Sequence, residues 1–383
     1  MLKIVRKLLV IYENIKNRLK NNNQSCANLD LPKHIQSSDI KEVSNNKNKK
    51  IQMNENSFLD NFRSFLNLKQ FDQAPLGNFK HGYVYAGNET IISETHFGCQ
   101  LFLNLKNFDV VPAILKTGWW EPWNDKLVRS ILTENDTYIN CGANFGYFTL
   151  LGAYCVGHKG TTISIEANPW LFDHLMKSIL YSGMKDRTHA FNCAVGHTSG
   201  EEMSVMFAPE WAGGGYVNSN DDKKVEEIPL TTESLANFKW PDTLSGKHNK
   251  GKGRKYETSH YSSLLSAKVP TLTLSDICED ITSDVRLIHM DIEGAEPGTI
   301  LGSKELIASC KDLFMIFEWS VHVRKDDEKK DAQEALKFLI NQGFKFYKIV
   351  PHGDAYLDFP KLQKMTKDDL MSEGHCDIFC TRY

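Results

Sequence analysis

A glycine turn directly after an apolar run constrains the fold of this chain more than any other feature. The stretch Thr137-Tyr-Ile-Asn-Cys-Gly-Ala-Asn-Phe-Gly-Tyr-Phe-Thr149 is predicted to begin as a strand and to end as the start of a helix. Between the two, Gly142 and Gly146 lie four residues apart with Asn144 midway. Glycine, and after it asparagine, tolerates a left-handed backbone, and a turn without side chains lets a ligand approach closely. Strand, glycine turn and helix in this order predict a nucleotide-cofactor site in a Rossmann-like α/β fold.

An acidic residue follows the turn at the distance that a Rossmann-like half requires. The apolar run Thr162-Ile-Ser-Ile-Glu166 ends in a carboxylate about 20 residues beyond the turn, where such folds carry the acid that binds ribose hydroxyls. A helix near residues 171–182 and a strand over His189-Ala-Phe-Asn-Cys-Ala-Val195 then complete a βαβαβ half. Asn192 and Ala194, near the end of that strand, are candidates to border the base of the cofactor.

Acidic residues gather again at the end of a third predicted strand. The segment Val285-Arg-Leu-Ile-His-Met-Asp-Ile-Glu-Gly-Ala-Glu296 is mostly apolar up to Met290 and then carries three acids. Ligands of open α/β sheets bind beyond the carboxyl ends of the strands, so these acids are expected at the site. Because side chains alternate along a strand, His289 and Asp291 fall on one face.

Four segments carry a resemblance to a known family: Asn140-Cys-Gly-Ala-Asn-Phe-Gly-Tyr-Phe-Thr149, Ile165-Glu-Ala-Asn-Pro169, Val269-Pro-Thr-Leu-Thr-Leu-Ser-Asp276 and Ile288-His-Met-Asp-Ile-Glu-Gly-Ala-Glu296. In this order they resemble the FkbM family of S-adenosylmethionine-dependent methyltransferases. The resemblance covers roughly residues 110–320, extends toward the C-terminus and does not include residues 1–57. It implies a Rossmann-like class I methyltransferase fold of the α/β class. That fold has a seven-stranded, mostly parallel sheet in the order 3-2-1-4-5-7-6, with the last strand antiparallel and helices on both faces.

The resemblance also implies the cofactor and the residues around it. We expect S-adenosyl-L-methionine to lie on the glycine turn, with the acid after the second strand on its ribose. The residues expected to bind it are Asn140, Gly142, Ala143, Asn144, Gly146, Glu166, Asn192 and Ala194.

Methyl transfer needs an acceptor held in line with the methyl group and, for a hydroxyl acceptor, a group that removes its proton. Asp291 is the first candidate to contact the donor or the acceptor, Glu293 follows, and His289 is the candidate proton acceptor. The alternative for His289 is a hydrogen-bonded core residue, and Glu318 with His322 offers a second acid–base pair. We expect O-methylation of a hydroxyl on a sugar, a glycan or a glycosylated small molecule.

The chain departs from the family pattern at two positions. The family usually opens its glycine turn with Asp-Val-Gly-Ala-Asn, where this chain has Asn140 and Cys141, and it commonly has lysine in place of His289. Asn140 can form hydrogen bonds, but an amide cannot neutralise the ammonium or sulfonium charge of the cofactor. Two alternatives stay open: a catalytically inactive methyltransferase-like binding module and, on the glycine pattern alone, an NAD-dependent oxidoreductase.

Charge and cysteine content narrow the class of protein. The net charge of −3 divides unevenly, because residues 1–57 carry 11 Lys or Arg against 5 Asp or Glu and leave the remainder acidic. A net negative charge on residues 58–383 argues against a general nucleic-acid-binding protein. The nine cysteines are scattered without a C-x-x-C pair, which indicates reduced, mostly buried thiols and favours a cytoplasmic enzyme without a bound metal. A Mg²⁺ site among the acids is the alternative.

The sequence divides into three predicted parts. Residues 1–57 combine a basic amphipathic helix over residues 1–20 with a polar, flexible linker. That helix is too interrupted to span a membrane, so it either packs on its own domain or contacts a membrane surface or a partner. Residues 58–125 are predicted to form an N-terminal helical and β cap, and residues 126–383 the methyltransferase domain, with an insertion at about 208–268.

Three tryptophans, Trp119, Trp120 and Trp123, flank Glu121 at the end of the predicted cap. Aromatic side chains of this size serve either the core or a surface on which a sugar ring stacks. The sequence leaves both interpretations open.

Overall fold

The computed structural model describes residues 81–217, 226–227, 265–282, 284–320, 326–373 and 375–383. All described residues belong to one compact unit, Ser64–Tyr383. The predicted N-terminal amphipathic helix, its linker, a short helix expected at 58–66 and the second residue of the alternative acid–base pair, His322, lie outside the described residues.

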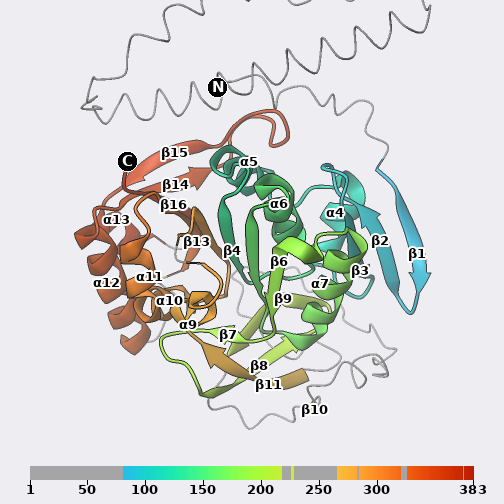
Figure 1. Cartoon of the computed structure of the whole chain (residues 1–383), viewed down its shortest axis with the longest axis horizontal. Helices are drawn as coiled ribbons and strands as arrows, with labels where there is room; N and C mark the ends of the chain where they lie inside the picture. Colours follow the sequence, from blue (N-terminus) through green and yellow to red (C-terminus); the bar gives the residue numbers. More distant parts are fainter. Residues whose placement is uncertain (1–80, 218–225, 228–264, 283, 321–325, 374) are drawn as a thin grey trace, which may run out of the picture. The chain divides into compact units, whose positions relative to one another are not determined.

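Within the described residues, eight strands form the central sheet, in the order β15-β14-β16-β13-β12-β4-β5-β6 (Figure 1). Their bounds are β4 Thr137–Cys141, β5 Thr161–Ile165, β6 Thr188–Phe191, β12 Leu287–Met290, β13 Phe314–Ser320, β14 Lys345–Val350, β15 Lys361–Met365 and β16 His375–Thr381. Strands β6, β5, β4, β12 and β13 run parallel, and β16 lies antiparallel between β13 and β14. The predicted order, including its antiparallel last strand, is confirmed. The additional edge strand β15 was not predicted.

Helices cover both faces of this sheet, as predicted. One layer contains α5 Pro122–Ile131, α6 Tyr147–Val156 and α7 Pro169–Tyr181; the other contains α9 Leu274–Cys278, α10 Glu296–Gly302, α11 Lys304–Ser309 and α12 Asp326–Asn341 (Figure 1). The remaining helical elements of the described residues are α4 Val111–Thr117, α13 Lys367–Ser372 and a 3-10 turn at Lys185–Arg187. Caps define several of their ends: the side chain of Asn168 accepts a hydrogen bond from the amide of Trp170 at the start of α7, and Gly118 ends α4 with a left-handed backbone.

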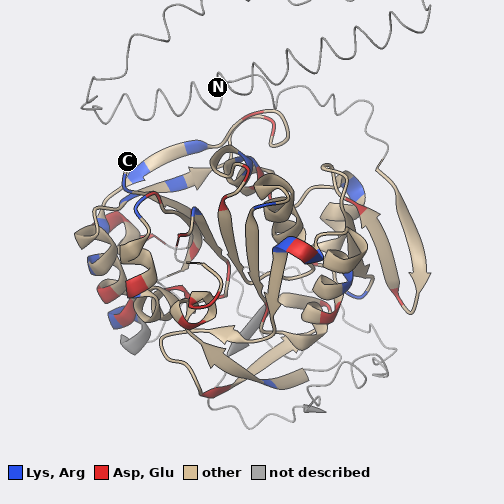
Figure 2. Cartoon of the chain, viewed as in Figure 1, with Lys and Arg blue, Asp and Glu red and all other residues tan. Residues whose placement is uncertain are grey.

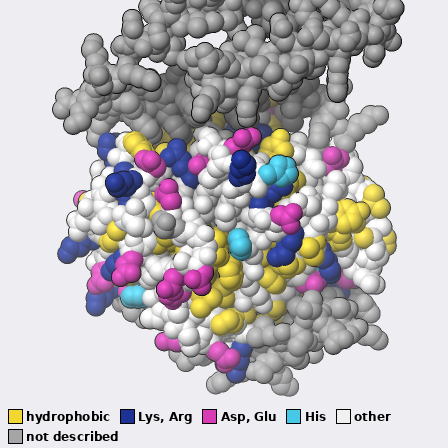
Figure 3. Space-filling view, viewed as in Figure 1, with side chains coloured by type: hydrophobic (Ala, Val, Ile, Leu, Met, Phe, Trp, Pro, Cys, Tyr) yellow, Lys and Arg dark blue, Asp and Glu magenta, His cyan; other side chains and the backbone are white. Residues whose placement is uncertain are grey.

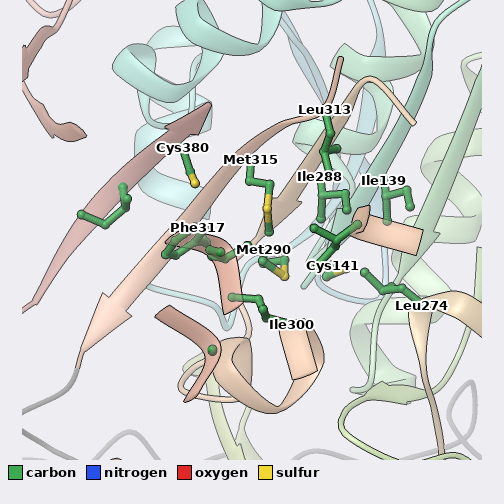
Figure 4. Packing of buried hydrophobic residues seen from close by; sticks show 14 of the residues in the cluster. Ile139, Cys141, Leu274, Ile288, Met290, Ile300, Leu313, Met315, Phe317 and Cys380 are labelled. Atoms are coloured by element: carbon green, nitrogen blue, oxygen red, sulfur yellow. The ribbon is translucent and has the colours of Figure 1, made fainter. Parts of the chain in front are cut away.

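Alternation along the strands divides the core between the two helical layers. Ile288 and Met290 of β12 pack with Phe317 of β13 and Ile300 of α10 in one hydrophobic cluster (Figure 4). The intervening residue His289 contacts the opposite layer, where α6 lies. Side chains two residues apart share a face, so we expect the side chain of Asp291 to face the α5–α6 layer as that of His289 does.

A second sheet packs beside the central one and corrects one predicted strand. It contains β7 Ala194–Val195, β8 Glu202–Ala208, β9 Trp211–Val217, β10 Glu226–Glu227 and β11 Leu265–Leu272. The strand expected over residues 189–195 is divided, because β6 ends at Phe191 in the central sheet while β7 pairs with β11. The predicted insertion at about 208–268 therefore begins and ends in regular strands of this sheet.

The described part of the predicted cap contains a third, antiparallel sheet of β1 Tyr83–Gly87, β2 Thr90–Glu94 and β3 Gln100–Asn104. The backbone amide of Phe102 in β3 donates to the hydroxyl of Ser178, which ties this sheet to α7. β1 leaves the side chains of Tyr83, Val84 and Tyr85 exposed (Figure 3). In the part of the chain that the structure describes, no helix has the length and apolar character needed to cross a membrane.

The packing of α6 on β4 predicts an unusual effect of a helical glycine. A Cβ atom at Gly152 would lie 2.0 Å from Cδ1 of Tyr138, a fully buried ring. Alanine favours a helix over glycine by about 1 kcal/mol, but overpacking a core costs about 1–3 kcal/mol. We expect Gly152→Ala to lower the free energy of unfolding by about 1 kcal/mol or more, measured by urea denaturation.

Gly298→Ala in α10 is the matched control, because a Cβ atom there would approach its nearest neighbour no closer than 3.7 Å. That substitution should leave stability unchanged or raise it by up to about 1 kcal/mol. Equal effects of the two substitutions would contradict the close packing of α6 on Tyr138.

Candidate active site

The glycine turn joins β4 to α6 and lies against the end of β12. Gly142 has a φ of 80°, and a Cβ atom there would lie 1.7 Å from the backbone oxygen of Asp291. The amide of Asp291 also donates to the carbonyl of Cys141 at 3.0 Å. Both the positive φ and the close approach require glycine at position 142. The turn and the acidic segment after β12 are therefore in direct backbone contact.

The backbone amides of the turn all have acceptors within the chain. The amides of Gly142 and Ala143 both donate to the carbonyl of Ile165. The amide of Asn144 donates to Oε2 of Glu166, and the amide of Phe145 donates to Oδ1 of Asn144. The amide of Gly146 donates to the carbonyl of Ala143. A dinucleotide site offers free amides to the pyrophosphate. This turn has none to offer, which suits a nucleoside cofactor without phosphates.

Glu166 is held at the end of β5 by backbone amides. Its Oε2 accepts a hydrogen bond from Asn144 at 2.7 Å, and its Oε1 accepts one from Asn168 at 2.8 Å. Glu166 is 6% exposed, and burial raises its pKa to about 7, although these hydrogen bonds oppose the rise. Each carboxylate oxygen can accept more than one hydrogen bond, so the carboxylate has capacity left for ribose hydroxyls. The residues present thus fit the cofactor, and the role of Glu166 stays a prediction.

The other predicted cofactor residues differ in their surroundings. Asn140 is 2% exposed, and its Nδ2 donates to Oγ1 of Thr149 at 3.0 Å. Asn192 donates to the carbonyl of Glu166 at 2.8 Å and so shapes the segment after β5. Ala194 is buried in β7, within a small apolar cluster of the second sheet. Contact of these residues with a cofactor stays a prediction.

Four carboxylates from four elements lie close together beyond the strand ends, and we call them the acid cluster. Asp291 follows β12, Glu318 lies in β13, Asp377 lies in β16 and Glu121 directly precedes α5; Figure 2 shows such residues in red. Glu318 and Asp377 are neighbours across β13 and β16. The Nδ2 of Asn124 donates to Glu121 at 2.9 Å and to Asp377 at 3.1 Å.

Burial and mutual repulsion make the carboxyl groups of Asp291, Glu121 and Glu318 weak acids. Burial, followed by repulsion from Glu318, raises the pKa of Asp291 well above its usual range. Burial and the neighbouring Asp377 raise the pKa of Glu121 to about 8. Burial, with repulsion from Glu293 next, raises the pKa of Glu318 to about 9. Carboxyl groups in this state hold protons near neutral pH and become strong bases once they ionise.

The segment after β12 owes its shape to a buried carboxylate. Glu296 is fully buried, and its Oε1 accepts hydrogen bonds from the amides of Ile292 and Gly294 at 3.1 and 3.3 Å. Glu293 between them has a φ of 52° and an exposed side chain, and Glu121 across the site has a φ of 42°. Positive φ values are uncommon outside glycine and concentrate at functional sites. Glu296 thus positions the backbone, while Glu293 lies at the exposed rim of the acid cluster.

The predicted proton acceptor His289 lies in the core. It is 3% exposed, its Nδ1 lies 3.2 Å from the hydroxyl of Tyr138, and its ring meets Phe148 edge to face at 4.5 Å. Burial lowers its pKa to about 3, so the imidazole stays neutral and is a weak base at neutral pH. These contacts favour the alternative interpretation of His289 as a hydrogen-bonded core residue.

The three tryptophans take different places around Glu121. Trp119 is 7% exposed and stacks on the ring of His96 at 3.4 Å, which favours a core role. Trp123 is partly exposed, and its Nε1 donates to Asp377 of the acid cluster at 3.0 Å. Trp120 is also partly exposed.

Sequence reasoning missed two residues of β16 that belong to this site. Asp377 completes the acid cluster, and His375 lies two residues before it with its Nε2 3.3 Å from Oε1 of Glu318. The only signal was the alternation of polar and apolar residues at the start of β16, which places both side chains on one face. Their partners lie far away in the sequence, so the alternation alone did not identify them.

Metal and thiol chemistry receive no support from the described geometry. Over the described ranges, no group of three or more His, Cys, Asp or Glu is arranged to hold a metal ion. The cysteines in these ranges are free, and burial raises the pKa of Cys193 and of Cys278 to about 12. Thiols with such pKa values are poor nucleophiles and poor metal ligands.

Comparison with protein families gives one match. The model of the methyltransferase FkbM domain matches residues 140–346, more than half of the chain. The match begins at the glycine turn and ends in β14, so it includes Glu166, Asp291 and Glu318. No curated protein matches the chain.

Solved structures with detectable similarity include the following three proteins. An S-adenosylmethionine-dependent O-methyltransferase of Thermotoga maritima is 12% identical, with 79% of this chain and 85% of that chain covered and a TM-score of 0.31. Fibrillarin of Aeropyrum pernix, with natively bound S-adenosyl-L-methionine, is 10% identical, with coverages of 78% and 99% and a TM-score of 0.33. TYW2 of Pyrococcus horikoshii, in complex with MeSAdo, is 11% identical, with coverages of 78% and 74% and a TM-score of 0.34. Similarities this low carry no conclusion about substrate.

The raised pKa of Glu166 predicts a pH-dependent affinity for S-adenosylhomocysteine. Ribose hydroxyls donate to the ionised carboxylate, so affinity should increase as pH rises through about 7, where Glu166 loses its proton. Glu166→Ala should weaken binding by about 1.5–3 kcal/mol and remove this dependence. Calorimetry between about pH 6 and 8 measures both effects.

Glu279→Ala, which removes an exposed acid after α9, is the control. A folded Glu166→Ala protein with unchanged affinity would show that this carboxylate serves the turn alone.

Proposed function

The chain belongs to the FkbM methyltransferase family, and from this premise we propose that it methylates a hydroxyl of a sugar, a glycan or a glycosylated small molecule. Methyl transfer and S-adenosyl-L-methionine as donor follow from family membership. The oxygen acceptor and its sugar character are the proposal. Family membership leaves the NAD-dependent alternative without support, and the occupied amides of the glycine turn also argue against it.

The acid cluster next to the glycine turn is the observation that carries the proposal. When bound, the cofactor would supply an electrophilic methyl group to the acceptor oxygen. The hydroxyl proton must leave the oxygen in the same process. Asp291 lies beside the turn and Glu318 lies on the neighbouring strand β13. Both have raised pKa values, so once ionised they are bases strong enough to accept this proton.

Several groups around these bases suit an acceptor with more than one hydroxyl. Carboxylates accept hydrogen bonds from hydroxyls, and carboxyl groups that hold a proton also donate. Glu121 and Asp377 can therefore orient neighbouring hydroxyls of a sugar ring. Trp120 and Trp123 are partly exposed next to Glu121, and aromatic faces pack against the apolar faces of sugars.

Two measurements test the proposal in sequence. Calorimetry with S-adenosylhomocysteine and with NAD should show binding of the first alone. The full chain is then incubated with labelled S-adenosylmethionine and a panel of sugar nucleotides, glycan extracts and small amines. We expect label in an ether linkage to a sugar oxygen. Cofactor binding without transfer to any acceptor would support the inactive binding module, and label on amines alone would refute the hydroxyl acceptor.

Asp291→Asn tests the acid cluster directly, because it keeps the shape of the side chain and removes its charge. Turnover should fall by about 10²-fold or more, the scale of one acid–base or positioning group, while the melting temperature changes little. Steady-state kinetics and thermal unfolding measure the two. Asp284→Asn, an exposed residue before the opposite end of β12, is the control and should leave turnover unchanged. Full activity of Asp291→Asn would place the proton acceptor elsewhere.

The location of the protein remains part of the proposal. We expect a cytoplasmic enzyme whose residues 1–20 contact anionic membrane surfaces, as their basic amphipathic pattern indicates. The full chain should sediment with anionic vesicles, a chain without residues 1–57 should not, and the difference should fade as salt rises. Sedimentation that ignores salt would contradict an electrostatic attachment.

A further inference from the structure

A histidine on the outer side of the acid cluster connects a half-buried carboxylate with solvent. The Nε2 of His375 lies 3.3 Å from Oε1 of Glu318, and its Nδ1 lies 2.8 Å from Oγ of Ser320. The side chain of His375 is 68% exposed, whereas that of Glu318 is only 15% exposed. The register of β13 and β16 fixes this arrangement, because Ser320 lies opposite His375 and Glu318 lies opposite Asp377.

We propose that His375 relays the acceptor's proton from Glu318 to solvent after each methyl transfer. The inference rests on the proposed function, since only a hydroxyl acceptor releases a proton in this way. His375 does not contact the acceptor; it restores the charge of the group that does.

The proton path is balanced at each step. The acceptor hydroxyl loses its proton to the ionised carboxylate of Glu318, which becomes a neutral carboxylic acid. That acid donates its proton to the unprotonated Nε2 of His375, and the resulting imidazolium releases a proton from Nδ1 toward Ser320 and water. Glu318 is then ionised again and the imidazole is neutral with its proton on Nε2. Exchange of the ring protons with water returns it to the tautomer with an unprotonated Nε2, and no oxidant or other reactant is needed.

The surroundings explain why Glu318 needs such a partner. Burial and the nearby carboxylates raise its pKa to about 9, so Glu318 gives up its proton slowly at neutral pH, and a group that carries the proton to water shortens the time before the next turnover. The exposed imidazole of His375, 3.3 Å from Oε1 of Glu318, offers that route. The charged groups that face Glu318 from the elements around it are the carboxylates of Asp291, Glu293, Glu296, Asp377 and Glu121. Lys348 on β14, which forms an ion pair with Glu373 at 3.0 Å, lies on the neighbouring strand.

Kinetics of His375→Gln test the relay. At neutral pH, kcat should fall by about 10-fold or more while KM for the acceptor stays the same, because the acceptor is bound by other groups. The rate of the variant should rise with pH and with buffer concentration, since water and buffer then remove the proton. Imidazole added to His375→Ala should restore part of kcat, which a purely structural role does not allow.

His158→Gln is the matched control. This histidine lies between α6 and the start of β5, at the opposite ends of the parallel strands, and forms a hydrogen bond with Arg187 and not with a carboxylate. A second readout requires no turnover. NMR of the imidazole nitrogens should show that Glu318→Gln shifts the Nε2 signal of His375 and leaves that of His158 unchanged.

The outcomes separate the relay from the proposed function. Wild-type transfer to a hydroxyl, combined with an unchanged kcat and pH profile in His375→Gln, overturns the relay alone. The same holds if kcat falls without rescue by imidazole, or if the Nε2 signal of His375 is unchanged in Glu318→Gln. A wild-type protein that methylates no hydroxyl overturns both proposals.

Discussion

The contact between Gly142 and the backbone carbonyl of Asp291 is the constraint on which the site depends. It is possible because position 142 has no Cβ, and the hydrogen bond from the amide of Asp291 to Cys141 maintains it. β4 and β12 are paired side by side, so both chains turn away from the sheet at the same level. The cofactor turn and the first acid of the cluster are consequently fixed relative to each other by backbone alone, without any flexible side chain between them.

Repulsion within the acid cluster is the second constraint. Four carboxylates lie close together and partly shielded from water, and the raised pKa values of Asp291, Glu121 and Glu318 express that conflict. Two hydrogen-bond donors from α5, Trp123 and Asn124, lie beside these carboxylates and reduce the repulsion. A positively charged ligand relieves such repulsion further, which is consistent with a family whose methyl donor is a sulfonium.

The amide that departs from the family pattern has a structural explanation. Asn140 points into a buried polar chain in which its Nδ2 donates to Thr149, whose hydroxyl lies 2.7 Å from that of Ser164. All three residues are at most 2% exposed. A carboxylate at this depth would have to hold a proton or find a cation, whereas an amide is satisfied by neutral partners. The substitution that motivated an inactive binding module therefore fits the local packing of β4, α6 and β5.

The sequence by itself determined the α/β class, the glycine turn and the acid after β5, because each is a local pattern of periodicity and spacing; the strand order came from the resemblance. It misplaced the end of the third strand, where Asn192 turns back to bond the segment after Glu166 and β7 joins another sheet. It also assigned His289 to the site, since alternation gives the face of a side chain but not its depth below the surface. Only the tertiary structure decided that Glu121, Glu318 and Asp377 lie near Asp291 and that His375 contacts Glu318. These residues are separated by up to 256 positions, and the antiparallel strand β16, inserted between β13 and β14, brings its two residues beside Glu318.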